Sequence, residues 1–164
     1  MKRSGGIIII ALAAALASGL AAASASTGTA AANDVVRFAN AARAQHGLRP
    51  LQRSRALDRS AVMKGEEIRG CRTFSHTPCG MSFMRTFERT GYVRGSTRVG
   101  ENLYWGSGGL GTPTNAIAGW LRSPPHRANL LSRSWRDIGV GMVYSPSLFG
   151  AQNVWLFVLQ FGRR

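Results

Sequence analysis

Acidic residues are scarce in this chain of 164 residues, which has 7 Asp and Glu against 21 Lys and Arg and a formal net charge of +14. Only Lys2 and Lys64 are lysines, so the basic character rests on arginine. A basic surface attracts anionic polymers, phospholipid head groups and free nucleic acid. The arginines are scattered, with no block of about five or more and no interleaved aromatic residues, so nucleic acid is not the expected partner.

Long apolar runs are absent beyond residue 20, so no later segment is apolar enough to span a membrane. The N-terminus has Lys2 and Arg3, an apolar stretch from Ile7 to Leu20, and the small residues Ala23-Ser24-Ala25. This order predicts a signal peptide over residues 1–25, and a retained membrane anchor is the alternative. The stretch is shorter than the ~20 residues of a span, which favours cleavage. Cleavage after Ala25 leaves 164 − 25 = 139 residues and predicts a secreted, extracellular or periplasmic protein.

Cysteine is equally rare, since Cys71 and Cys79 are the only two. They lack the CxxC spacing of most sulfur-based metal sites, which disfavours such a site. In an exported protein an even pair so close together predicts one disulfide. That disulfide would close a small loop around His76 and restrict the backbone that presents this side chain.

The hydrophobic patterns predict helices first and strands last. We expect residues 26–32 to be a disordered N-terminus and residues 33–164 to form one domain. Helices are expected from Asn33, as the N-cap, to Gly47, and over 54–70, 81–90 and 112–123, with a short turn at 128–131 and strands at 138–144 and 154–161. Lys64, Glu66, Glu67 and Arg69 are expected on the outward face of the second helix. Without βαβ alternation, the order predicts an α+β domain with a largely antiparallel sheet.

Three short segments hold two of the three histidines and one of the few carboxylates: Phe74-Ser75-His76, Gly100-Glu101-Asn102 and Ser123-Pro124-Pro125-His126-Arg127. The steps 101 − 76 = 25 and 126 − 101 = 25 are equal, and each has room for one element and its loops. His76, Glu101 and His126 can therefore meet in one cleft. Two neutral imidazoles and a carboxylate suit Zn²⁺ with an open position for water, which permits hydrolysis. The alternative is structural: Glu101 accepts hydrogen bonds from both rings, and Asn102 ties the loops together.

Serine and tryptophan residues near these segments are further candidates for the site. Ser75, Ser82 and Ser123 are close to the histidines in sequence, but no GxSxG elbow is present, so a serine nucleophile is not favoured. Trp105 lies beside a glycine-rich stretch and is expected to line the cleft together with Asn102 and Ser123. The other tryptophans are expected in the core.

Taken in order, the segments FSH, GEN, WLRSPPHR, IGVGMVY and FG resemble the CAP superfamily (cysteine-rich secretory, antigen 5 and pathogenesis-related-1 proteins) in its short bacterial SCP-like form. The resemblance runs from Asn33 to Gly162 and includes Asn40–Arg43 and Gly47–Leu51. It implies an α-β-α sandwich with helices on both faces of an antiparallel sheet. It also implies a cleft with two histidines, matched by His76 and His126, and two acids.

One of the two acids is missing. Glu101 matches the Glu of the GEN segment, whereas the second acid of the family pattern, three residues after the tryptophan matched by Trp120, is Ser123 here. The family's full set of four is therefore incomplete, and no family mechanism carries over. The resemblance implies lipids or cell-envelope components as ligands.

Three functions are consistent with this sequence, and they leave open whether the protein is an enzyme. The first is an extracellular ligand-binding or effector module, a monomer that binds a lipid or another cell-envelope component through a His/Glu cleft. The second is a Zn²⁺-assisted hydrolase that uses His76, Glu101 and His126. The third is a non-enzymatic binder of polyanions.

Overall fold

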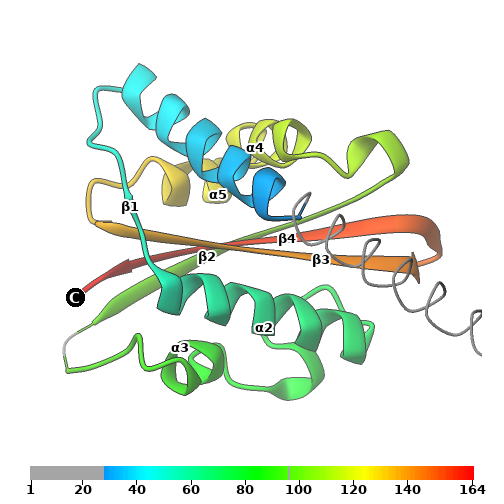
Figure 1. Ribbon diagram of the computed structural model, residues 1–164. Coiled ribbons are helices and arrows are strands. Elements are labelled where there is room, and N and C mark those ends of the chain that lie inside the picture. The colour runs from blue at the N-terminus through cyan, green and yellow to red at the C-terminus, as the bar shows by residue number, and fades with distance from the viewer. Residues whose placement is uncertain (1–27, 96) are drawn as a thin grey trace, which may run out of the picture.

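A four-stranded sheet lies between two layers of helices in the computed structural model, which describes residues 28–95 and 97–164 (Figure 1). The strand order is β1-β3-β4-β2; β1 pairs with β3 in parallel, and the other pairs are antiparallel. The strands are β1 Gln52–Arg53, β2 Arg98–Ser107, β3 Asp137–Leu148 and β4 Ala151–Arg163. The predicted α+β class and largely antiparallel sheet are confirmed.

Helices cover both faces of the sheet, as the family resemblance implied (Figure 1). One layer holds the N-terminal helix over residues 28–45, α4 Pro113–Arg122 and α5 Pro124–Leu130, and the other holds α2 Arg55–Cys71 and α3 Arg85–Arg89. Side chains alternate along β4 between the two layers. Phe157 and Leu159 pack with Trp120 in one core cluster, whereas Leu156 and Val158 pack with Ala61 in the other.

The start of the N-terminal helix differs from the prediction. The helix is already formed at residue 28, so Asn33 lies inside it and the predicted N-cap is wrong. Residues 28–32, expected to be disordered, are helical, and Ala32 is buried with Val35 in the core, which helps to fix this turn. Residues 1–27, with the predicted signal peptide and its cleavage site, lie outside the described residues.

Helix boundaries elsewhere follow local capping. The Ser54 side chain caps α2, near the predicted start of that helix, and the Thr112 side chain caps α4 with Pro113 at its first turn. α3 is shorter than the predicted helix over 81–90. The prolines Pro124 and Pro125 end α4 and also begin α5, because the first turn of a helix tolerates a missing N–H. No helix in the described ranges is long and apolar enough to cross a membrane.

Candidate functional site

His76 and Glu101 meet in a direct hydrogen bond. The Nδ1 atom of His76 lies 2.8 Å from Oε1 of Glu101. The Glu101 side chain, on β2, is 0% exposed, whereas that of His76 is 48% exposed. A carboxylate only accepts hydrogen bonds, so the proton of this pair sits on Nδ1 of the ring. The Nε2 edge of His76 is therefore left free to contact a ligand.

Gln160 holds Glu101 from behind. Its Nε2 donates to Oε2 of Glu101 over 2.8 Å, and the two residues are register partners on β4 and β2. Gln160 is fully buried beside Thr86 of α3, which accepts a hydrogen bond from Ser60 of α2 at 3.0 Å. Sequence analysis missed this residue. The sequence offered one signal for Gln160, because it is a single polar side chain within the apolar stretch of β4.

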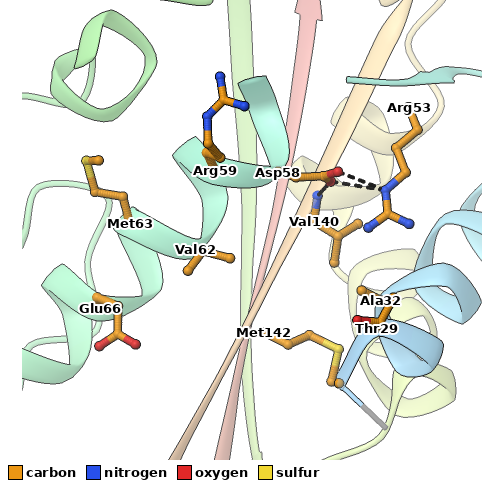
Figure 2. A pocket seen from close by; sticks show the side chains of 11 residues that line it. Thr29, Ala32, Arg53, Asp58, Arg59, Val62, Met63, Glu66, Val140 and Met142 are labelled. Atoms are coloured by element: carbon orange, nitrogen blue, oxygen red, sulfur yellow. Dashed lines mark hydrogen bonds and ion pairs between the residues drawn. The ribbon is translucent and has the colours of Figure 1, made fainter. Parts of the chain in front are cut away.

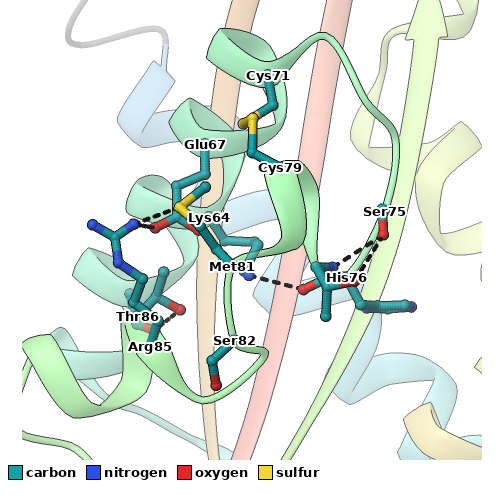
Figure 3. Close-up of polar contacts among 12 residues, drawn as sticks. Lys64, Glu67, Cys71, Ser75, His76, Cys79, Met81, Ser82, Arg85 and Thr86 are labelled. Atoms are coloured by element: carbon teal, nitrogen blue, oxygen red, sulfur yellow. Dashed lines mark hydrogen bonds and ion pairs between the residues drawn. A yellow bond between two sulfur atoms is a disulfide. The ribbon is translucent and has the colours of Figure 1, made fainter.

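The loop that carries His76 is fastened at two points. The predicted disulfide between Cys71 and Cys79 is confirmed. Nζ of Lys64 donates to the backbone oxygen of His76 over 2.9 Å and pairs with Glu67 at 3.4 Å (Figure 3). Lys64 is fully buried, so its predicted place on the outward face of the helix is wrong. A buried ammonium needs such partners, and Lys64 uses them to hold His76 in place.

His126 stands at the beginning of α5. Its Nδ1 atom lies 2.8 Å from Oγ of Ser123, so the serine at the position of the missing acid contacts the second histidine. Burial, and then the nearby His76 ring, lower the pKa of His126. The two histidines are bonded to adjacent residues of β2, His76 to Glu101 and the backbone oxygen of His126 to Asn102. The lowered pKa favours the neutral form of His126 at neutral pH.

Asn102 does not line the cleft, contrary to the prediction. It is fully buried, its Nδ2 donates to the backbone oxygen of His126 over 2.9 Å, and its Oδ1 accepts from Asn129 at 3.0 Å. Asn102 therefore ties β2 to α5 behind the site. Gly100 allows this close approach of β2 to α5, since a Cβ there would lie only 2.9 Å from Oδ1 of Asn129.

Trp105 also lies away from the histidines. It is four residues beyond Glu101 on β2, about 13 Å along an extended strand. Its ring packs 5.5 Å from that of Phe149, at the turn between β3 and β4. That Trp105 lines the cleft stays a prediction.

A separate hollow of about 640 Å³ lies over β3, between the N-terminal helix and α2 (Figure 2). Val62, Met63 and Met142 supply apolar lining, and the arginines Arg53 and Arg59 also border it. Asp58 is held by Arg53 at 2.9 Å and by the backbone N–H of Val140 at 2.9 Å. No histidine lines this hollow, so it is distinct from the cleft.

The arrangement does not fit a zinc centre with three ligands. Glu101 uses one oxygen for His76 and the other for Gln160, and within the described ranges no group of three His, Cys, Asp or Glu residues is placed to hold a metal ion. What remains is a pair of imidazoles whose Nδ1 atoms are both hydrogen-bonded.

Comparisons with known proteins agree with this architecture. The model of the family described as CAP, the cysteine-rich secretory protein family, matches residues 36–161. The uncharacterized protein YkwD of Bacillus subtilis is 31% identical over 120 residues, which are 73% of this chain and 45% of that protein. This chain therefore spans less than half the length of that relative.

Solved structures share the fold. An extracellular protein containing an SCP domain from Bacillus anthracis matches with a TM-score of 0.66 and 21% identity, over 84% of this chain and 41% of its own. An outer surface protein from Borrelia burgdorferi matches with a TM-score of 0.63 and 23% identity, over 79% of this chain and 89% of its own. A cysteine-rich secretory protein from Staphylococcus aureus matches with a TM-score of 0.62 and 18% identity, over 84% of this chain and 39% of its own.

Proposed function

The chain belongs to the CAP (cysteine-rich secretory protein) family, and from that premise we propose that it is an extracellular binding module for a component of the cell envelope. Three structural relatives are called extracellular, outer-surface or secretory proteins, which supports a place outside the cell. The predicted cleavage leaves a net charge of +14 − 2 = +12. Such a charge favours the anionic polymers and lipids of an envelope.

One observation carries the proposal: two histidines are held by neighbouring residues of β2, Glu101 and Asn102, and each has Nδ1 hydrogen-bonded by the protein. His76 is presented to solvent and fixed by a buried carboxylate, so its orientation is set before a ligand arrives. Preorganised donors and acceptors at a surface favour binding, because less rotational freedom is lost on association. We assign the polar contact with the ligand to the Nε2 edges of His76 and His126.

The test compares two histidine variants in co-sedimentation with an isolated envelope fraction. We expect H76A/H126A to lower the bound fraction at least tenfold, a loss of about 1.4 kcal/mol. H46A is the matched control, because His46 is an exposed histidine that contacts Ala42 and Arg127. Equal binding by both variants would show that the cleft does not bind the envelope.

A lipid is the ligand class that the hollow of Figure 2 supports. Its apolar lining suits an acyl chain, and Arg59 lacks a carboxylate partner among the described residues and suits an anionic head group. Val62 is 42% exposed there. We expect V62D to weaken binding of a fluorescent fatty acid severalfold, whereas L110D, at another exposed apolar residue, leaves it unchanged.

A metal-assisted hydrolase is the second candidate, in a form in which His76 and His126 alone would hold the metal and Glu101 is not a ligand. Histidines that bind metals usually hold one ring nitrogen in a hydrogen bond and offer the other. A bound Zn²⁺ would supply a water of lowered pKa, while Glu101 orients His76. Elemental analysis of protein purified without chelator checks this candidate. No divalent metal, and no uptake at micromolar concentration, would eliminate it.

A further inference from the structure

A polar pocket of about 240 Å³ lies at the end of the molecule that carries β1 and the loop before β3, on the left in Figure 1. Residues 47–49, in the turn after the N-terminal helix, form one wall, and Arg133 and Arg136, in the loop between α5 and β3, form another. Arg43, from the N-terminal helix, also lines the pocket. None of its lining residues belongs to the His76–His126 cleft.

The guanidinium of Arg43 is a buried cation without a nearby anion. The residue is 1% exposed, its Nε donates to the backbone oxygen of Arg49 at 3.1 Å, and its Nη1 donates to those of Leu130 and Ser132 at 2.8 and 2.9 Å. These acceptors are neutral carbonyls. Burial, and then the charge of Arg136, lower the pKa of Arg43. A guanidinium nevertheless stays protonated at neutral pH, so the two positive charges remain beside each other.

Among the described residues, no ion pair offsets the positive charge of the arginines that line the pocket. In the ranges that the structure describes, the ion pairs engage other bases, and none includes Arg43, Arg49, Arg133 or Arg136. Four arginines therefore line one small polar space, and its lining includes no carboxylate. Such an arrangement raises the local potential and favours an anion from solution.

We propose that this space, which we call the arginine pocket, binds a phosphoryl group. The planar fork of arginine matches the oxygens of a phosphate and donates two parallel hydrogen bonds. A phosphate also offers more negative charge and more acceptor oxygens than a carboxylate. At about 30 Å³ per water, the pocket holds roughly eight waters, enough for a phosphoryl group and part of the molecule that bears it.

The experiment has a soluble arm and a membrane arm. The probes are inorganic phosphate in isothermal titration calorimetry, and vesicles of phosphatidylglycerol or phosphatidylcholine in co-sedimentation. R133Q/R136Q removes two exposed charges from the pocket and spares the buried Arg43. R89Q/R94Q removes two exposed charges elsewhere and is the matched control. H76A/H126A is expected to bind phosphate like the unchanged protein, which separates this proposal from that for the cleft.

We expect phosphate to bind the unchanged protein and R89Q/R94Q alike, and R133Q/R136Q at least tenfold more weakly. Binding to phosphatidylglycerol vesicles alone, lost only in R133Q/R136Q, also supports the proposal and identifies a lipid head group as the source. The proposal is overturned if neither probe binds. It is also overturned if the two double variants lose binding equally, because diffuse surface charge would then account for it.

Discussion

At the scale of single residues, a hydroxyl group stands where the family pattern has a carboxylate. Ser123 Oγ contacts Nδ1 of His126, whose pKa is already lowered by burial and by His76. A serine can bond to a neutral imidazole but adds no charge to stabilise the protonated ring. The site therefore keeps one carboxylate-backed histidine, His76, and one that is neutral at neutral pH.

Placing a carboxylate at position 123 is expected to favour the protonated form of His126. In S123E the new carboxylate beside His126 stabilises the imidazolium, so the pKa of His126 rises above the usual ~6.5. An NMR titration of the ring carbons measures the change. S147E, on an exposed part of β3, is the control and should leave the His126 titration unaltered. An identical His126 pKa in both variants would contradict the assigned Ser123 contact.

The same histidine predicts how stability depends on pH. Because the pKa of His126 is lower in the folded than in the unfolded state, the unfolded chain binds more protons as the pH falls. The contribution of His126 to the free energy of unfolding is fully present above about pH 6.5. It is lost as the pH falls through the pKa that His126 has in the folded state. We expect H126N to flatten the decline in unfolding free energy between neutral and acidic pH, measured by urea titration. H46N should retain the decline, and the idea fails if H126N declines as steeply.

Sequence reasoning reached the chemically distinctive residues and missed those that support them. His76, Glu101 and His126 stand out because histidines and acids are rare in this chain. Gln160 and Lys64 resemble an ordinary strand residue and an ordinary surface charge. Their roles depend on contacts with Glu101 and with the backbone of His76, which the local pattern does not encode.

At the scale of elements, α2 approaches β3 unusually closely. A Cβ on Gly139 would lie 2.3 Å from Leu57, and one on Gly141 would lie 2.3 Å from the backbone of Ala61. These glycines sit on the face of β3 that α2 covers. The approach matters for function because α2 carries Lys64 and leads directly into the disulfide loop of His76.

Filling one of these positions should separate the two elements. We expect G141A to destabilise the protein by about 1–3 kcal/mol or more, since backbone atoms of α2 have nowhere to move. Urea unfolding measures the loss. G70A is the matched control, because it lies in the last turn of α2 with no atom within 4 Å of the added methyl, and alanine favours helix. Similar free energies for the two variants would rule out the close packing.

The disulfide loop is the other element on which the site depends. Replacing both cysteines, as C71S/C79S, should cost about 2–3 kcal/mol of unfolding free energy, since the bridge closes a short loop. We also expect the Nδ1–H resonance of His76 to broaden, because the loop then keeps only its contacts with Lys64 and Glu101 near this residue. Unchanged stability together with an unchanged His76 resonance would show that the bridge does not support the site.

At the scale of the whole molecule, the α+β class and the antiparallel sheet followed from the order of periodic segments, whereas the two helical layers were implied by the family resemblance. Features that depend on long-range contacts were missed. β1 is only two residues long and exists because Gln52 and Arg53 pair with β3 far along the chain. Residues 28–31, the first described turn of the N-terminal helix, are small, and the helix is anchored just beyond them by Ala32 and Val35, which pack in the core. Neither feature has a local pattern strong enough to predict it.

Export remains a prediction for the whole chain, and mass spectrometry of the protein from the culture medium or periplasm measures it. We expect a chain of 139 residues that begins at Ser26, because the small residues before it suit signal peptidase. The cut lies before residue 28, so it removes none of the residues that the structure describes. A product that retains residues 1–25 in a membrane fraction would favour the anchor instead.

The position of the cysteine pair links the assembly of the cleft to the redox state around the chain. Cytoplasmic reductants keep thiols apart, so a newly made copy still inside the cell would hold Cys71 and Cys79 unjoined. The loop that carries His76 would then be less restrained. We expect it to reach its final position only after the disulfide forms in an oxidising compartment. In a copy that stays in the cytoplasm, we expect the sheet to fold but the His76 loop to lack its fixed position. Formation of the disulfide after export would then complete the site.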